Sequence, residues 1–554
     1  MVKNNEKGGA QKAHHKDRVI EFTKTLEWTI MAFILALVFR AFVMEAYRIP
    51  TGSMAPTLKG DHYLLRCPQC GHRYEYGFDS SGNAGSGRAG IKSLSSRCPS
   101  CGYFSTNDPI PIAKGDRILV LKCIYQFLEP KRWDVVVFKN PLDPRINYIK
   151  RLIALPGETI EIIDGDIYID GKIQRKPPKV QEELWMPVYN NDYQPARPKQ
   201  GVFNGHLWQQ PFIPAASNDA SPNSNRSNTT GTDSQWQVAQ DNPTVFRLDS
   251  PAEQISTMVY DTSRGNDFRT TYAYNDVNRY RFMPFCSDLK VRLYANSFGR
   301  QAVIGIELSK YQTRYRASVR PDGNMIIERI ENGRQAEKLT GKSIKNAFTK
   351  EPKLLSFTNI DHQLIFRFGR EKLIYDLGLS EDAAGAREIE LEPSVKIVGS
   401  GKLAVSHVAI FRDIHYTSSK YGNGRPDGRA VEGNSFTLRE NEFFVLGDNS
   451  PNSEDGRWWA QKGIGNKGAF YRQGIVPHDY LVGKALFVYW PSGFEFPWPR
   501  NLRAYLYKNS RQNTLFRIAN VLVSLNWIPN LGQMRFIYGG SNSRGKTNKV
   551  SNGV

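Results

Sequence analysis

Residues 148–158 read YIKRLIALPGE and place one lysine inside an apolar, β-prone run that ends at a Pro-Gly turn. A lysine in such a strand either points into solvent or is buried. If Lys150 is buried, desolvation lowers the pKa of its amine, and the neutral amine can then take a proton from a hydroxyl group near physiological pH. Taken alone, a solvated lysine at a sheet edge is the commoner arrangement.

Two further apolar runs predict strands. Residues 132–138, RWDVVVF, predict a buried strand that ends before Asn140 and Pro141. Residues 443–446, FFVL, predict another strand, and the polar loop GDNSPNSEDGR follows at 447–457. An ion pair between Asp455 and Arg457 would fix this loop, although an ordinary solvated hairpin turn explains the same residues.

A serine that could serve as a nucleophile occurs near the N-terminus, in residues 47–58, YRIPTGSMAPTL. The Pro and Gly that precede Ser53 favour an exposed turn, and most Gly-Ser turns are only turns. The position of this one is informative, because it directly follows a long apolar stretch. A nucleophile there would lie at a membrane surface.

That apolar stretch, residues 26–44, contains only two charges, Glu27 and Arg40. As a helix of about 19 residues it reaches about 28 Å, roughly the thickness of the hydrocarbon core. The lysines and arginines of residues 1–25 favour a cytoplasmic N-terminus. A cleaved signal peptide would need a small-x-small site, which EAYRIPTGSM after residue 44 does not offer, and a buried soluble helix would show a polar stripe. We therefore expect a retained single-pass anchor in the cytoplasmic (inner) membrane, with the rest of the chain on the outer side.

The composition limits the class of protein. With 554 residues the chain should form about two to four domains. Its low mean hydropathy excludes a polytopic membrane protein. The net charge of +20 suits an anionic surface, either nucleic acid or lipid headgroups. No Lys/Arg run typical of nucleic-acid binding is visible, so we expect membrane lipid as the partner.

Four of the six cysteines form two nearly identical knuckles, CPQCG and CPSCG, containing Cys67, Cys70, Cys98 and Cys101. Two such knuckles predict a tetrahedral four-thiolate site that holds a structural zinc ion. The 27 residues between the knuckles exceed the usual range of about 15–20, and the Gly/Ser-rich residues 80–90 would absorb the excess. In an oxidising outer compartment two disulfides are the alternative. We expect Cys123 and Cys286 to be buried thiols.

Taken together, the serine turn, the strand before the lysine, the lysine strand and the GDN…S-x-D-x-R loop resemble the type I signal peptidase family. The four motifs occur in the family's order, and Val476-Pro477 and Gly483-Lys484-Ala485 also fit. The resemblance covers about residues 15–60, 113–172 and 440–500. It does not cover the cysteine-rich segment or most of the middle of the chain.

The resemblance implies a membrane-bound serine endopeptidase with a Ser-Lys dyad and no cofactor for catalysis. It would remove signal peptides from exported preproteins, with Ser53 as the nucleophile and Lys150 as the general base. It assigns supporting roles to four further residues. The Thr51 hydroxyl and the Ser53 N–H would form the oxyanion hole, and Ser453 would orient the lysine amine. Asp455 and Arg457 would support the site from behind. Gly456 replaces a residue that is usually serine, which leaves the loop geometry open.

The resemblance also implies a substrate preference and a binding mode. Family members cut after small residues in an Ala-x-Ala pattern, and an extended substrate would add a strand beside the segments that hold Ile49 and Tyr148. The small pockets would be lined by Tyr47, Ile49, Leu58, Tyr148 and Ile149.

The middle of the chain, about residues 173–440, is too long for a simple connection. The polar stretch 214–240 predicts a flexible linker. The short alternating segments after it predict a β-sandwich, and their pattern resembles the concanavalin/laminin-G-like jelly rolls. The sandwich would bind a glycan or a protein, or serve only as a spacer.

The predicted fold is mainly β, with an antiparallel catalytic core, one transmembrane helix, an inserted zinc ribbon and an inserted β-sandwich. The predicted boundaries are a basic tail at 1–25, the transmembrane helix at 26–45, core segments at 46–62, 113–175 and 441–500, the ribbon at 63–112, the insertion at 176–440 with its sandwich at about 243–420, and a basic C-terminal tail at 501–554. The alternative function is a specialised or catalytically retired surface protein whose ribbon and sandwich bind a partner.

Overall fold

The computed structural model describes residues 7–78, 94–107, 112–215, 235–276, 282–297, 301–331, 334–345, 351–384, 391–419, 427–465, 470–492, parts of 502–524, and 530–540. The Gly/Ser-rich loop at 80–90 and most of the predicted linker lie outside these residues.

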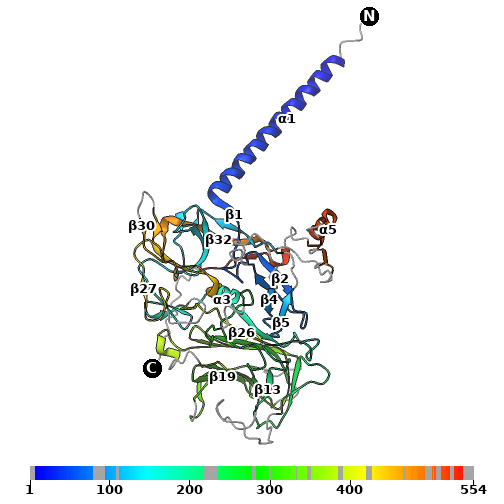
Figure 1. Cartoon of the computed structure of the whole chain (residues 1–554), viewed down its shortest axis with the longest axis vertical. Helices are drawn as coiled ribbons and strands as arrows, with labels where there is room; N and C mark the ends of the chain where they lie inside the picture. The colour runs from blue at the N-terminus through cyan, green and yellow to red at the C-terminus, as the bar shows by residue number, and fades with distance from the viewer. Residues whose placement is uncertain are drawn as a thin grey trace.

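A long helix precedes the body of the molecule. Helix α1 (Lys7–Val38) continues as a π-helical turn, η1 (Phe39–Val43), and the chain then enters strand β1 (Met44–Arg48). Within the described residues, Glu21–Val43 is the one helical segment long and apolar enough to cross a membrane, and none of it is buried. Figure 1 shows α1 extending away from the body, with β1 at its base. Strand β1 therefore begins inside the segment predicted as transmembrane.

The first sheet of the body is antiparallel and has eight strands. Its order is β1-β6-β32-β7-β8-β28-β31, and β33 pairs with β32. The strands after β1 are β6 (Arg117–Leu121), β7 (Val135–Lys139), β8 (Asn147–Ala154), β28 (Glu442–Leu446), β31 (Val476–Pro477), β32 (Leu481–Trp490) and β33 (Arg535–Phe536).

The continuous apolar run in β7 is explained by burial on both faces of this sheet. Val135 and Val137 pack into one hydrophobic cluster with Ile118, whereas Val136 and Phe138 pack into another. Alternate residues of a strand point to opposite faces, so a strand covered on both sides needs no polar positions.

A smaller four-stranded sheet adjoins the first, in the order β11-β10-β9-β27. Its strands are β9 (Thr159–Ile163), β10 (Asp166–Ile169), β11 (Lys172–Ile173) and β27 (Phe436–Thr437). A hydrophobic cluster that includes Ile160 and Ile167 joins it to Ile153 and Phe444 of the first sheet.

The insertion forms a β-sandwich of two antiparallel sheets that enclose one large hydrophobic core. The first sheet contains β14 (Gln237–Val238), β15 (Val245–Asp249), β26 (Lys402–Arg412), β17 (Leu289–Ser297), β22 (Lys353–Ile360), β23 (Gln363–Phe368) and β24 (Glu371–Asp376), with β12 (Met186–Asn190) on β26. The second contains β13 (Phe212–Pro214), β16 (Ser256–Tyr260), β25 (Val395–Ser400), β18 (Val303–Lys310), β19 (Thr313–Val319), β20 (Asn324–Ile330) and β21 (Glu337–Ser343).

The sandwich includes residues that the sequence analysis placed before it. Strands β12 and β13 precede residue 243, and Trp236, inside the predicted linker, is buried in the sandwich core. The sequence therefore predicted the mainly β class and a sandwich, whereas these short strands carry too few alternating residues to be recognised as strands.

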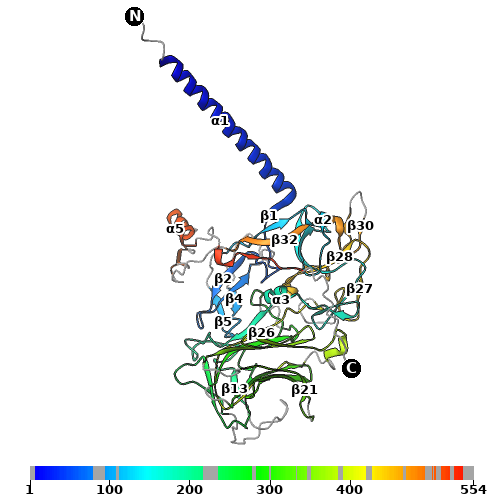
Figure 2. The same cartoon turned by 180° about the vertical axis from the view of Figure 1, so that it is seen from behind.

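The cysteine-rich segment folds as two hairpins, β2–β3 (His62–Arg66 and Arg73–Gly77) and β4–β5 (Leu94–Arg97 and Phe104–Asn107). Figures 1 and 2 place these hairpins between the first sheet and the sandwich. The remaining elements are α2 (Ile124–Phe127), α3 (Pro178–Glu183), α5 (Thr514–Ser524), the pair β29 (Gly463–Ile464) and β30 (Phe470–Tyr471), and the 3-10 turns η3 (Glu381–Ala384), η5 (Ser450–Asn452), η7 (His478–Tyr480) and η8 (Leu531–Gln533).

Candidate active site and four-cysteine centre

The candidate serine and lysine meet although 97 positions separate them. Ser53 lies on the turn after β1, and Lys150 lies in β8 opposite Val136 of β7. The Lys150 amine donates a hydrogen bond to Ser53 Oγ at 2.8 Å and another to the Ile149 carbonyl at 3.2 Å. Only 4% of Lys150 is exposed, so the structure contains the buried arrangement rather than the solvated one.

Burial changes the acid–base chemistry of this lysine. Desolvation lowers the pKa of the Lys150 amine to about 8, while the carboxylates of Asp455, Asp448 and Glu454 act in the opposite direction. An amine with a pKa of about 8 is partly neutral near physiological pH. It can therefore accept the proton of a hydroxyl that it contacts.

The loop after β28 is held by a buried ion pair, as the ion-pair alternative of the sequence analysis supposed. Arg457 Nε and Nη2 donate to the two carboxylate oxygens of Asp455 at 2.9 and 2.8 Å. Asp455 also accepts the Gly447 N–H at 3.0 Å, and Arg457 donates to the Thr417 carbonyl at 2.8 Å and to Ser450 Oγ at 2.8 Å. These bonds fix the loop backbone that faces Ser53.

The same loop holds the backbone of the serine turn. The N–H of Asn449 donates to the Ser53 carbonyl at 3.0 Å, and its side-chain amide donates to the Gly52 carbonyl at 3.0 Å. At Gly447, a Cβ would overlap Ser453 Oγ and lie 2.5 Å from the Ser53 carbonyl oxygen. Only glycine allows this approach of the loop to the turn.

One of the predicted supporting residues, Ser453, does not make the bond expected of it. Ser453 is buried beside Gly447, but its Oγ has no hydrogen-bond partner among the described residues, so it does not bond the Lys150 amine here. Thr51 is exposed on the serine turn, and its backbone carbonyl packs against Gly60.

The sequence analysis missed a second buried ion pair. Arg151 donates to both carboxylate oxygens of Asp448 at 2.8 and 2.7 Å, and neither side chain is exposed. Because neighbouring residues of a strand face opposite sides, Arg151 anchors the loop from the face opposite to Lys150. The two adjacent charges of Lys150 and Arg151 inside an apolar run were the sequence feature that could have indicated a buried ion pair.

Four of the five predicted pocket residues gather in one cluster. Ile49 and Leu58 are buried there, and Tyr47 and Ile149 pack against them. Tyr148 packs on the other face of β8, where its ring centroid lies 5.6 Å from the Lys150 amine.

Strand β8 has an open edge beside the Ser53 turn. Its pairing with β28 involves Arg151, Leu152 and Ala154 only, so within the described strands Asn147–Lys150 are unpaired on that side. The Asn147 side chain reaches the Tyr47 hydroxyl of β1 at 3.4 Å. An extended chain that lies along this edge would pass the Ser53–Lys150 pair.

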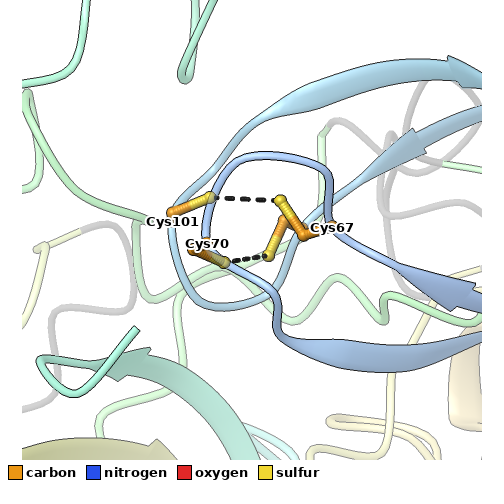
Figure 3. A group of neighbouring side chains, drawn as sticks. Cys67, Cys70 and Cys101 are labelled. Atoms are coloured by element: carbon orange, nitrogen blue, oxygen red, sulfur yellow. Dashed lines mark hydrogen bonds between the residues drawn. The ribbon is translucent and has the colours of Figure 1, made fainter. Parts of the chain in front are cut away.

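The four cysteines of the two knuckles form one compact group. Cys67 Sγ lies 3.7 Å from Cys101 Sγ, Cys70 Sγ lies 3.7 Å from Cys98 Sγ, and all four sulfurs lie within 4.8 Å of one another (Figure 3). A tetrahedral zinc site with Zn–S bonds of about 2.3 Å has sulfur–sulfur edges of about 3.8 Å, whereas a disulfide requires about 2.05 Å. The four sulfurs therefore form a set able to hold one structural metal ion.

The two knuckles also share a backbone conformation that suits metal binding. Gly71 and Gly102 have φ of 76° and 74°, and each donates its N–H to the carbonyl of the first cysteine of its knuckle at 3.0 Å. Positive φ is the reason for glycine at both positions. Hydrogen bonding to Cys101 lowers the pKa of the Cys67 thiol, whereas burial raises the pKa of Cys98 and the contact with Cys67 raises that of Cys101.

Comparison with known proteins agrees with this geometry. Residues 22–70, 106–231 and 411–490 match the family described as signal peptidase, peptidase S26. By these segments, just under half of the chain is similar to the signal peptidase family. The matched residues include Ser53, Lys150 and the loop from Gly447 to Arg457, whereas Cys98 and Cys101 lie outside them.

Among curated proteins, the chain is similar to signal peptidase I of Rickettsia canadensis (strain McKiel) and of Rickettsia felis (strain ATCC VR-1525 / URRWXCal2). Each is 36% identical over 156 residues, which is 28% of this chain and 46% of the relative. The chain thus spans about half the length of these signal peptidases.

Solved structures resemble part of the chain at low TM-scores. Carbohydrate-binding module CBM66 from Bacillus subtilis has a TM-score of 0.22 and 8% identity, and covers 32% of this chain and 91% of its own. Galectin LEC-6 of Caenorhabditis elegans has a TM-score of 0.18 and 12% identity, and covers 23% of this chain and 87% of its own. At these TM-scores the likeness says nothing about what the sandwich binds.

Proposed function

We propose that this protein is a membrane-bound serine endopeptidase of the signal peptidase family that removes N-terminal signal peptides from exported proteins. The observation that carries the proposal is the 2.8 Å hydrogen bond between the buried Lys150 amine and Ser53 Oγ. A buried lysine beside a serine has the two properties that a Ser-Lys dyad needs, a depressed pKa and contact with the nucleophile.

In the proposed reaction, the neutral Lys150 amine takes the proton of Ser53 as Oγ attacks the scissile carbonyl carbon. The resulting ammonium then gives its proton to the leaving amine, and an acyl group remains on Ser53. Water, deprotonated by Lys150, releases the acyl group and regenerates the serine. The Ser53 N–H and the Thr51 hydroxyl would stabilise the oxyanion.

The substrate would bind as an added strand on the open edge of β8, at Asn147–Lys150. Main-chain hydrogen bonds would supply affinity, and side-chain pockets would supply specificity. The cluster of Tyr47, Ile49, Leu58 and Ile149 would line pockets for small side chains, in keeping with cleavage after Ala-x-Ala. Ser453 would rotate to bond the Lys150 amine once substrate orders the site.

The membrane anchor would bring the site to its substrates. Because β1 begins directly after Val43, Ser53 lies about ten residues from the end of the segment that would span the membrane. We propose that the N-terminus is cytoplasmic, that the catalytic sheet rests on the outer side of the membrane, and that the four cysteines hold a structural zinc ion.

Cleavage of a preprotein tests the proposal directly. The protein purified in detergent should cut a preprotein after the second alanine of an Ala-x-Ala site, because the proposed pockets would admit only small side chains. The same preprotein with phenylalanine in place of that alanine should stay intact. If neither is cut where an established signal peptidase cuts the first, the alternative of a specialised or retired surface protein gains support.

The rate should also follow the protonation of Lys150. Since only the neutral amine accepts the Ser53 proton, kcat/KM should rise with pH and level off above an apparent pKa of about 8. Glu454→Gln should lower that apparent pKa, because the Glu454 carboxylate raises the pKa of Lys150.

Initial rates measured from about pH 6 to pH 10 give both values. Glu371→Gln, on the distant strand β24, is the control and should leave the profile unchanged. A rate that stays constant across this range would contradict a lysine base.

A further inference from the structure

A short segment of the insertion reaches the candidate active site. Residues Thr270–Asn275 lie outside the segments that match the signal peptidase family. Thr270, Tyr272, Tyr274 and Asn275 are nevertheless all buried. They contact the serine turn, the loop after β28 and the four-cysteine module.

Asn275 makes a reciprocal pair of hydrogen bonds with Asn449. The Asn275 amide donates to Asn449 Oδ1 at 2.8 Å, and the Asn449 amide donates to Asn275 Oδ1 at 2.9 Å. The second hydrogen of the Asn449 amide is the one that bonds the Gly52 carbonyl. Asn275 and the Gly52 carbonyl together fix which way the Asn449 amide faces, because a flipped amide would point its oxygen at both Asn275 Oδ1 and the Gly52 carbonyl oxygen.

The two tyrosines of the segment reinforce this contact. Tyr272 donates its hydroxyl to the Asp448 carbonyl at 3.3 Å, and the Arg412 guanidinium lies 5.1 Å from its ring centroid. The ring of Tyr274 occupies the space beside Gly52 and Gly77, where a Cβ at either glycine would overlap it. The Tyr274 carbonyl accepts the Gly77 N–H at 2.8 Å.

From these contacts we propose that Asn275 is a positioning residue for Ser53, acting through the side-chain amide of Asn449. This inference rests on the proposed peptidase function. Without Asn275, the Asn449 amide keeps one of its three side-chain hydrogen bonds, its hold on the Gly52 carbonyl weakens, and the serine turn moves relative to Lys150. A displacement of about 1 Å at a reacting group costs on the order of a hundredfold in rate. The insertion is then part of the catalytic unit rather than an appended binding domain.

Asn275→Ala tests the proposal, with Asn266→Ala as the matched control. Asn266 is an equally buried asparagine of the same insertion, and its amide donates to the Val188 carbonyl at 2.9 Å, away from the site. Asn275→Ala should lower kcat by tenfold to a hundredfold and leave KM within about twofold, whereas Asn266→Ala should keep kcat. If both variants lose stability but only Asn275→Ala loses kcat, the loss of kcat comes from the position of Ser53 and not from lower stability.

A double-mutant cycle tests whether the effect passes through Asn449. Asn275→Ala combined with Asn449→Ala should be no slower than Asn449→Ala alone, because both changes break the same contact. If the losses of kcat in the two single variants instead add in the double variant, Asn275 does not act through Asn449. If the alanine variant does not fold, Asn275→Leu fills a similar volume without hydrogen bonds and takes its place.

Hydrogen exchange separates failure of this inference from failure of the proposed function. In Asn275→Ala, amides of residues 52–58 and 447–452 should exchange on the order of tenfold faster than in wild type or Asn266→Ala. This readout needs no substrate, so it holds even if wild type cuts no preprotein. Unchanged exchange and an unchanged kcat in Asn275→Ala would show that the segment does not position the serine.

Discussion

Lys150→Met is expected to abolish cleavage and, at the same time, to raise the free energy of unfolding near neutral pH. Methionine fills a similar volume but has no amine to take the Ser53 proton, so kcat should fall on the order of 10⁴-fold or more. The gain in stability follows from burial, because methionine places no charge in the site where Lys150 is 4% exposed.

The size and pH range of that gain follow from the pKa of Lys150. In the folded protein burial lowers this pKa from 10.5 to about 8, whereas the unfolded chain keeps the ordinary value. Below pH 8 both states bind the proton, and the folded state bears the full cost, about 3 kcal/mol. The cost shrinks as pH rises from 8 to 10.5 and is absent above that range.

Unfolding of wild type and Lys150→Met should therefore differ most at about pH 7 and least at about pH 11. Two controls isolate the chemistry. Ser53→Ala should lose cleavage to the same extent but should not show the pH-dependent gain, since Lys150 remains. Lys150→Arg keeps the charge but cannot act as a base, so it should also be inactive. Substantial cleavage by the arginine variant would remove Lys150 from the mechanism.

The sequence could predict the strands of the core because their signals are local. The run VVVF at 135–138 has a single explanation, a strand buried on both faces, and β7 is buried in this way. Polar loop residues after an apolar strand likewise predicted the position of the loop that carries Asp455 and Arg457. What the sequence left open was the burial of Lys150, because that depends on which segments cover β8.

Contacts between distant segments left no signal in the sequence. Asn275 meets Asn449 across 174 positions. Asn449 belongs to the GDN loop that the sequence analysis identified, whereas Asn275 belongs to no motif identified there. The short strands β12, β13 and β14 gain their structure from pairing with β26, β16 and β15, rather than from their own propensities. The same reason explains why Trp236 was assigned to a linker although it is buried.

Removing metal from the four-cysteine centre is the second change with a large expected effect. We expect about one zinc ion per chain, bound by Cys67, Cys70, Cys98 and Cys101, and a fall in the apparent Tm when a chelator removes it. Zinc bound to four thiolates contributes on the order of 10 kcal/mol of binding free energy, which is lost with the ion. Cys98→Ser should abolish zinc binding, whereas Cys123→Ser, with its thiol outside the cluster, should retain it.

Loss of zinc should also lower cleavage, although zinc takes no part in the chemistry. The module contacts the serine turn through Tyr274, whose carbonyl bonds Gly77 and whose ring packs beside Gly52. Thiol titration distinguishes the metal from disulfides. Cys123 is half-buried rather than buried as expected from the sequence, so with zinc bound it should react before unfolding. The five other thiols should react only after unfolding with chelator, because four hold zinc and Cys286 is buried. Metal-free protein with only two titratable thiols would instead show two disulfides, and the link between the module and the serine turn would then be independent of metal.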